Sequence, residues 1–162
     1  MTEIKYPYLP RGHTIVYVAQ RNRYMQMARR LAKKYRSNLL QPGGAVLVKD
    51  GAVIGRGSIG NNAVHRAGCE RVRLNMPTGH GYELCDGCNP KFHSERQAIE
   101  LARKKGFATS GGDLYLWGHW WCCESCWRAM LRAEIRTVYL LAGSERLFNR
   151  SHPDNILGRQ FD

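Results

Sequence analysis

Four residues in two short stretches of the chain could bind a metal ion and do chemistry with it. His93 offers an imidazole, and Cys123 and Cys126 offer two thiolates at a spacing typical of zinc ligands. Three protein ligands leave zinc one open position for water, which is typical of a catalytic rather than a structural site. Glu95 follows the histidine by two residues and is not needed as a ligand. We therefore predict that Glu95 is the catalytic residue that moves protons between water and substrate.

The chemistry expected of this combination is hydrolytic. Zinc would lower the pKa of a bound water from 15.7 toward about 7, so that hydroxide forms at neutral pH. Hydroxide suits attack on an amidine-like ring carbon, after which ammonia leaves and a carbonyl remains. Each motif alone has a simpler explanation, because His93 could cap a helix and the two cysteines could be a structural ligand pair. Together with Glu95, the motifs favour a catalytic zinc site.

A second group of cysteines precedes the first motif. The pair Cys85 and Cys88, with His65 and Cys69 upstream, has the composition of a closed, four-ligand structural zinc site. His80 could replace His65 in that set. The alternative is free thiols that pack as small hydrophobic side chains. Residues 61–92 show no hydrophobic periodicity, so we expect an insertion whose structure this second zinc ion holds together.

The elements that must position these residues can be read from hydrophobic periodicity and turn signals. Helices are expected at about 14–35, 93–105 and 123–133, and strands at 45–48, 52–54, 113–117 and 137–141. Asp50-Gly51 predicts a tight hairpin turn. Gly55, Gly57 and Gly60 are expected to interrupt the second strand, either as a simple exit or as a loop that approaches phosphate.

This order of elements predicts an α/β domain with three layers. A crossover helix between the last two strands makes those strands parallel, whereas the hairpin is antiparallel, so the central sheet is mixed. The helix starts at 93 and 123 can then meet at one edge of the sheet. The zinc site is therefore expected at helix N-termini.

At 162 residues, the chain is expected to be a single domain over 1–162, with 143–162 a polar and uninformative C-terminal tail. No apolar run approaches the roughly 18 residues of a membrane span. The N-terminus also lacks the profile of a signal peptide. We therefore expect no membrane partner and a cytoplasmic location.

The chain is strongly basic. Lys and Arg number 25 against 13 Asp and Glu, a formal net charge of +12 at pH 7. Such an excess attracts polyanions and phosphorylated substrates, which leaves both a small-molecule nucleotide and nucleic acid open as partners. A basic solvated surface with no specific partner explains the charge equally well.

The two motifs match the H-x-E and P-C-x-x-C signature of zinc deaminases, with Cys122 at the proline position. In addition, the segment 68–79 and the following Tyr82-Glu83-Leu84-Cys85 resemble the sequence before the His-x-Glu motif in dCMP-deaminase-like proteins. The chain thus resembles the cytidine and deoxycytidylate deaminase superfamily over about residues 20–142. The resemblance implies a cytidine-deaminase-like α/β/α fold with five strands, a homo-oligomer, and zinc-dependent deamination of a cytosine nucleotide. Only four strands are evident, so the fifth is expected from the tail.

The resemblance also implies substrate contacts. The backbone at Ser94 would meet the carbonyl edge of the base, and the backbone near Trp121 its amine. Ile59 stands where the family has a sugar-binding Asn, so Asn61 and Asn62 are the candidates for that contact. Trp120 and Trp121 could stack on a base or pack in the core.

Two other functions compete with a deaminase of free nucleotides. One is a cytidine or adenosine deaminase that acts on single-stranded DNA or RNA, where basic and aromatic side chains would form a stacking groove. The other is a non-catalytic zinc-binding module. Glu95 argues against the module, because a structural site has no use for a carboxylate that is not a ligand.

Overall fold

A five-stranded mixed sheet forms the centre of the molecule, in the order β1-β5-β4-β2-β3. The computed structural model describes residues 8–35, 43–59, 68–77 and 79–162. The strands are β1 (Ile15–Val18), β2 (Gly44–Lys49), β3 (Ala52–Ser58), β4 (Asp113–Trp117) and β5 (Thr137–Leu141). The parallel pairing of β4 with β5 and the antiparallel pairing of β2 with β3 confirm the predicted mixed sheet. At the hairpin turn, Asp50 and Gly51 have φ angles of 50° and 78°, as predicted.

The origin of the fifth strand was predicted wrongly. It is β1, which precedes the first helix and pairs in parallel with β5, and the tail forms the short helix α6 (Ser144–Phe148) instead. The predicted first helix is correspondingly too long at its start, because α1 spans Arg23–Lys34. Asn22 caps this helix by accepting hydrogen bonds from the backbone N–H groups of Tyr24 and Met25, at 3.0 and 3.1 Å. The cap fixes where helix replaces strand.

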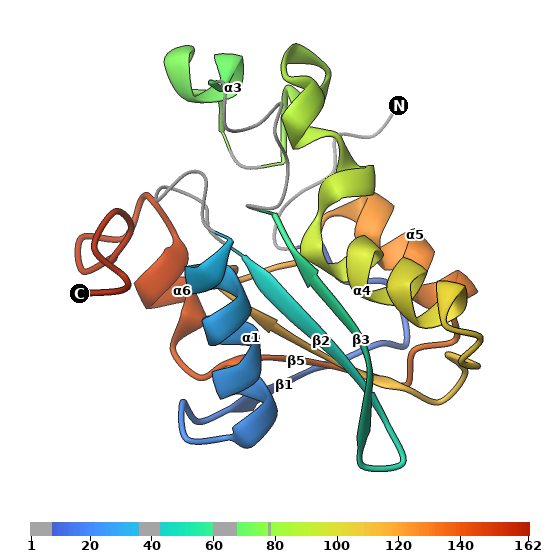
Figure 1. Ribbon diagram of the computed structural model, residues 1–162. Coiled ribbons are helices and arrows are strands. Elements are labelled where there is room, and N and C mark those ends of the chain that lie inside the picture. The colour runs from blue at the N-terminus through green and yellow to red at the C-terminus, as the bar shows by residue number, and fades with distance from the viewer. Residues whose placement is uncertain (1–7, 36–42, 60–67, 78) are drawn as a thin grey trace.

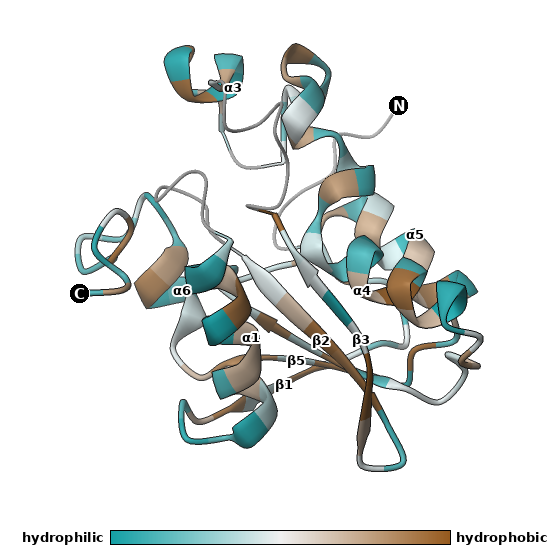
Figure 2. Ribbon diagram, viewed as in Figure 1, coloured by the Kyte–Doolittle hydropathy of each residue, from teal (hydrophilic) through white to brown (hydrophobic). Residues whose placement is uncertain are grey.

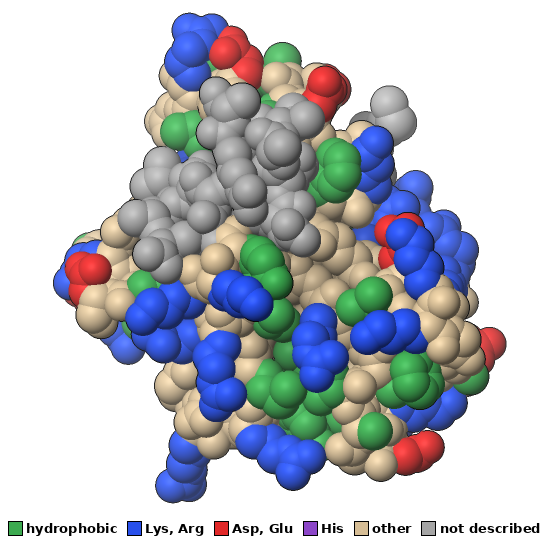
Figure 3. Space-filling model, viewed as in Figure 1, with side chains coloured by type: hydrophobic (Ala, Val, Ile, Leu, Met, Phe, Trp, Pro, Cys, Tyr) green, Lys and Arg blue, Asp and Glu red, His purple; other side chains and the backbone are tan. Residues whose placement is uncertain are grey.

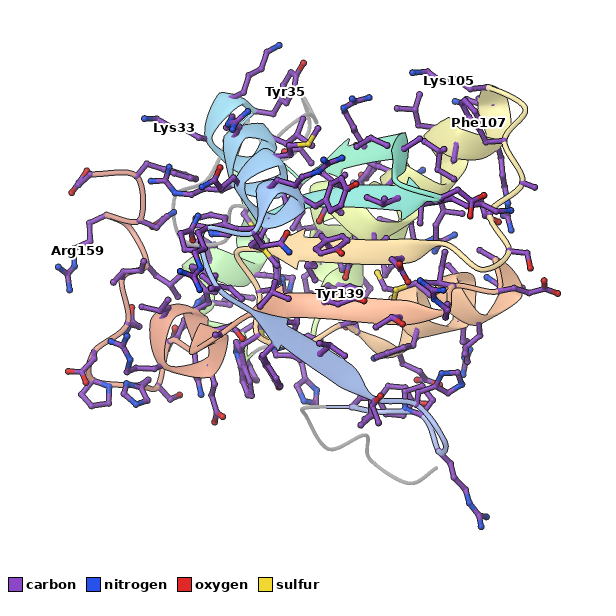
Figure 4. All side chains as sticks on the ribbon, turned by 90° about the horizontal axis from the view of Figure 1, so that it is seen from below. Lys33, Tyr35, Lys105, Phe107, Tyr139 and Arg159 are labelled. Carbon is purple, nitrogen blue, oxygen red and sulfur yellow. The ribbon has the colours of Figure 1, made fainter. Side chains whose placement is uncertain are left out.

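Helices cover both faces of the sheet and make three layers (Figure 1). Helices α1 and α6 lie on one side, and α4 (Ser94–Lys104) and α5 (Glu124–Arg132) lie on the other. Hydrophobic residues run along the central strands, while the helices alternate between hydrophobic and hydrophilic residues (Figure 2). The α1 side includes the stacked rings of Tyr115 and Tyr139, whose centroids are 4.4 Å apart; Tyr139 is labelled in Figure 4. The predicted α/β/α architecture is confirmed.

Close contact between α4 and β3 explains why positions 55 and 57 are occupied by glycine. A Cβ at Gly55 would lie 2.0 Å from the backbone oxygen of Ala98, and one at Gly57 would lie 2.1 Å from that of Ser94. Both glycines are within β3, so the expected interruption of the strand after residue 54 was wrong. They let the helix that begins next to His93 sit directly on the sheet. Gly60 lies outside the described residues.

Between β3 and α4, the described residues 68–77 and 79–93 include several short helical turns. These are α3 (Glu70–Arg73), η1 (Tyr82–Leu84), η2 (Asp86–Cys88) and η3 (Pro90–Phe92). In Figure 1, α3 lies above the end of the sheet at which α4 begins. None of the helices in the described ranges is long and apolar enough to cross a membrane.

The C-terminal segment packs against the α1 side of the sheet, which the polar composition of 143–162 did not suggest. The ring of Trp117 lies 5.0 Å from that of Phe148 and 5.3 Å from that of Phe161. Phe148 is buried, with 5% of its surface exposed. The segment is therefore part of the folded core and lies close to the end of β4.

Candidate metal centre and cleft

Two helix starts bring the candidate zinc ligands together. His93 is the N-cap residue of α4 and Cys123 that of α5, so both side chains project from the end of the sheet where β4 finishes. Nδ1 of His93 lies 3.5 Å from Sγ of Cys123 and 3.4 Å from Sγ of Cys126. All three donor atoms lie within 4.8 Å of one another. Two sulfurs and an imidazole nitrogen facing a common point fit a zinc ion, with the fourth position left open.

Hydrogen bonds orient these donors. Nε2 of His93 lies 3.2 Å from the carbonyl oxygen of Cys88, which can only accept, so Nε2 donates there and Nδ1 is the ring nitrogen that faces the two sulfurs. The backbone N–H of Cys126 donates to Sγ of Cys123 at 3.4 Å. The hydrogen bond from the Cys126 side chain, followed by that from His93, lowers the pKa of Cys123 to about 4. Cys123 is therefore ready as a thiolate ligand.

Glu95 lines a cleft together with His93 and Cys123, but it is not part of the group of metal ligands. Its side chain is 4% exposed, and the Ser94 hydroxyl donates to its Oε2 at 3.4 Å. Burial raises the pKa of the Glu95 carboxyl above its ordinary value. A raised pKa makes the carboxylate a better proton acceptor, which suits a group that must take up a proton and return it. Cys122, at the proline position of the motif, is fully buried and also lies outside the ligand group.

The cleft beside the metal centre encloses about 720 Å³, its open mouth included. The cleft is lined by His93, Glu95 and Cys123 and by three aromatic side chains, those of Tyr82, Trp120 and Trp121. Trp121 is 5% exposed and meets Trp120 edge to face, with ring centroids 6.4 Å apart. The two tryptophans therefore pack against each other and also border the cleft.

A family model decides what kind of protein carries this centre. The model of the cytidine and deoxycytidylate deaminase zinc-binding region matches residues 18–142. The chain belongs to this deaminase family. The match confirms the predicted superfamily and, at the level of family, the predicted class of enzyme, a zinc-dependent hydrolytic deaminase. The chemistry of the donor set and the family model agree on zinc as cofactor.

Solved structures of deaminases are similar to the chain. A diaminohydroxyphosphoribosylaminopyrimidine deaminase/reductase from Thermotoga maritima is 28% identical with a TM-score of 0.47, covering 72% of this chain and 28% of that one. A dCMP deaminase from cyanophage S-TIM5 is 22% identical with a TM-score of 0.48, covering 72% and 78%. Guanine deaminase from Bacillus subtilis is 24% identical with a TM-score of 0.47, covering 74% and 62%. The chain thus spans less than a third of the Thermotoga protein. Comparison with curated proteins gave no match.

The second cysteine group is also assembled. The three thiols of Cys69, Cys85 and Cys88 lie within 4.8 Å of one another, with Sγ of Cys69 3.4 Å from Sγ of Cys88. His80 is not in this group, and His65 lies outside the described residues. Three thiols so close together could hold a structural zinc ion. The fourth ligand is therefore not identified by the described ranges.

The remaining predicted substrate contacts are only partly placed. Ser94 is fully buried beside Glu95, and Trp121 lines the cleft. Asn61 and Asn62 lie outside the described residues. Ile59, which stands at the family's asparagine position, also lines the cleft.

Three cleft residues with charged or ionisable side chains were missed as site candidates in the sequence: Arg71, His119 and Arg150. Nε2 of His119 is buried and has no hydrogen-bond partner among the described residues. Burial, followed by the nearby charge of His93, lowers the pKa of His119 to about 4, so it is neutral at pH 7. Arg150 comes from the C-terminal segment, beyond the part of the chain that the family model matches. Arg71 lies in the family-like segment 68–79, but nothing in the sequence assigns it, His119 or Arg150 to a cleft, because long-range folding brings them together.

Basic side chains are not confined to the cleft. Lys and Arg are spread over the face shown in Figure 3, with few acidic side chains among them. On this face the positive charge is spread out and not gathered at one site, as the solvated-surface interpretation expects.

Proposed function

We propose that the chain catalyses hydrolytic deamination of a cytosine nucleotide, dCMP or a close relative, to the corresponding uracil nucleotide with release of ammonia. The observation that carries this proposal is the position of Glu95. It lines the same cleft as His93 and Cys123 yet stands outside the ligand group. A carboxylate in that position serves chemistry rather than metal binding.

The residues have distinct roles in this proposal. A zinc ion held by His93, Cys123 and Cys126 would supply a water molecule activated for attack. Glu95 takes a proton from the attacking water and delivers it to the ring nitrogen beside the amino-bearing carbon. Glu95 then moves a second proton to the amino group, so that the C–N bond breaks with ammonia as the leaving group. One water is consumed, and the ring carbon is left as a carbonyl.

Base recognition is assigned to the walls of the cleft. The backbone at Ser94 would bind the carbonyl edge of the base, and the backbone near Trp121 its amino group. Asn61 and Asn62 remain the candidates for sugar contacts. The neutral His119, with its unpartnered ring nitrogen among the described residues, is a further polar group available to the substrate.

The proposal is tested by measuring ammonia release over a panel of cytosine and adenine compounds, both free and in single-stranded polynucleotides. Glu95→Ala should keep its zinc and its fold yet lose turnover, because it removes the proton carrier and no metal ligand. Glu100→Ala is the matched control, since Glu100 is an exposed carboxylate on the same helix. Turnover by Glu95→Ala comparable with that of the unaltered protein would refute the mechanism.

The alternative is deamination of cytidine or adenosine within single-stranded DNA or RNA. The net charge of +12 and the aromatic walls of the cleft favour it. Salt separates the two, because binding through many phosphates weakens steeply as salt rises, whereas binding through one phosphate does not. We keep a homo-oligomer and a cytoplasmic location as predictions, to be checked by light scattering and by microscopy of a tagged chain.

A further inference from the structure

We propose that Arg71 and Arg150, which line the cleft beside Glu95, together bind the phosphate group of the substrate. This inference rests on the proposed deamination of a nucleotide and adds which residues select for the phosphate. Both arginines line the cleft that contains His93 and Glu95. A nucleotide whose base reaches Glu95 would extend its phosphate along that cleft.

Arg71 is held rigidly for such a role. Its side chain is 5% exposed, and its guanidinium lies 4.5 Å from the centre of the Tyr82 ring. Nε donates to the carbonyl oxygen of His80 at 2.8 Å, and Nη2 donates to that of Pro77 at 3.4 Å. Nη1 lies 3.6 Å from Sγ of Cys88. Three of its five N–H groups are thus engaged within the described part of the chain, and the guanidinium plane is fixed before a ligand arrives.

Arg150 brings a second cation to the same place. Its Nε is buried and has no hydrogen-bond partner among the described residues. Burial, followed by the positive charge of Arg71, lowers the pKa of Arg150, with opposing contributions from the thiols of Cys69 and Cys88. No carboxylate contributes to that shift, and neither arginine takes part in an ion pair among the described residues.

Two guanidinium groups that border one cleft and repel each other, with no carboxylate paired to either among the described residues, are unfavourable unless an anion joins them. If the thiols of the second cysteine group bind zinc, their negative charge is shared with the metal and compensates the arginines less. A phosphate group, with several acceptor oxygens and up to two negative charges, matches two forked donors. A neutral nucleoside offers no such group, so the pair should discriminate nucleoside monophosphates from nucleosides.

Arg150 lies outside the part of the chain that the family model matches. The residue follows α6 in the C-terminal segment, which is anchored by Phe148 on Trp117. The family model ends at residue 142. A segment outside the matched region therefore supplies half of the phosphate site, and substrate choice depends on it.

The test compares dCMP, deoxycytidine and a single-stranded oligonucleotide with one deoxycytidine as substrates. In Arg150→Gln, the preference for dCMP over deoxycytidine, measured as the ratio of kcat/KM values, should fall about 10- to 100-fold, the range expected for a charge-assisted hydrogen bond. Arg150→Lys should recover part of the preference. Arg159→Gln is the matched control, because Arg159 is exposed in the same segment and projects away from the body of the protein (Figure 4).

The single-stranded oligonucleotide shows whether the phosphate that the two arginines bind belongs to a mononucleotide or to a polynucleotide backbone. A larger loss on dCMP assigns the pair to the phosphate of a mononucleotide, and a larger loss on the oligonucleotide assigns it to a polynucleotide backbone. An unchanged preference in Arg150→Gln, with zinc content and thermal unfolding equal to those of the control, overturns the proposal while leaving the deaminase function intact.

Calorimetric titration with inorganic phosphate and with dUMP distinguishes failure of the phosphate site from failure of the proposed function. If no cytosine compound is deaminated but Arg150→Gln binds both ligands at least about 10-fold more weakly than Arg159→Gln does, the anion site stands and the proposed function fails. Equal binding by the two variants overturns the anion site whatever the activity.

Discussion

Nε2 of His93 lies 3.2 Å from the carbonyl oxygen of Cys88, and the thiol of Cys88 belongs to the second cysteine group. One residue therefore takes part in both candidate metal sites, through its backbone at the first and through its side chain at the second. Cys88 is the last residue of η2, so its backbone carbonyl and its thiol are held by the same short helical turn. Anything that fixes that thiol also fixes the acceptor that orients the His93 ring.

Loss of the second site should therefore weaken the first. We expect Cys85→Ser to reduce bound zinc from two equivalents per chain to one, measured by metal analysis of the purified protein. The remaining zinc should be held about 10- to 100-fold more weakly, the usual cost of losing an outer-shell partner, because the Cys88 carbonyl is then less well fixed. Competition with a chelator measures this affinity.

Cys122→Ala is the control for a cysteine outside both ligand groups. It removes a buried thiol of the core and should leave two zinc ions per chain with unchanged chelator resistance. One zinc per chain in the unaltered protein would rule out the second site. Two zinc ions with an unchanged first affinity in Cys85→Ser would rule out the coupling.

Gly57→Ala should destabilise the protein through the contact between β3 and α4. The new Cβ would lie 2.1 Å from the backbone oxygen of Ser94, so the helix that follows His93 would have to move. Overpacking of this kind costs about 1–3 kcal/mol, which chemical denaturation measures. Gly51→Asn is the control, because that position is open and Asn tolerates its φ of 78°. Equal stability of the two variants would contradict this account of β3.

Much of the frame around this contact could be predicted from local sequence. The β2–β3 turn and the strands β4 and β5 have strong local signals, and α4 and α5 combine an apolar face with motif residues at their starts. The need for glycine at position 57 could not be predicted from the sequence. It depends on how closely α4 approaches the strand at Ser94, which is 37 residues later in the chain. For the same reason, Arg71 and Arg150 look like ordinary surface cations until the chain folds.

The error over β1 has a different cause. This strand lies at the edge of the sheet, and its central residues Val16 and Tyr17 are both partly exposed, at 41% and 57%, so its burial does not alternate from residue to residue. Without that alternation, the helical periodicity that begins at Tyr24 is easily extended backwards over the strand. The capping residue Asn22 is the local signal that separates the two elements.

Asn22→Ala should lower the free energy of unfolding by about 1 kcal/mol. The substitution removes the acceptor for the backbone N–H groups of Tyr24 and Met25 and leaves the first turn of α1 without its cap. Asn22→Asp keeps an acceptor at the same place and should restore most of the loss. Urea denaturation of the three proteins at one pH tests the cap. Equal losses in both variants would mean that the cap contributes little.

Stability should fall in alkaline solution because of Tyr115. Burial, followed by the neighbouring hydroxyl of Tyr139, raises the pKa of Tyr115 to about 12, compared with about 10 for an unfolded tyrosine. Between these values the folded state binds more protons than the unfolded state, so the free energy of unfolding decreases as pH rises through this interval. Below pH 10 the contribution of Tyr115 is constant. Denaturation curves from pH 8.5 to 11.5 measure the decrease.

Tyr115→Phe isolates this effect from the titration of other groups. The phenylalanine ring can still stack on Tyr139, whose centroid lies 4.4 Å from that of Tyr115 in the unaltered protein. It has no hydroxyl that could ionise. The stability of the variant should decline less steeply above pH 10 than that of the unaltered protein. Tyr17→Phe is the control, because it also removes a tyrosine hydroxyl but at a position that is 57% exposed. If Tyr115→Phe and Tyr17→Phe decline in parallel with the unaltered protein, burial of the Tyr115 hydroxyl does not govern alkaline unfolding.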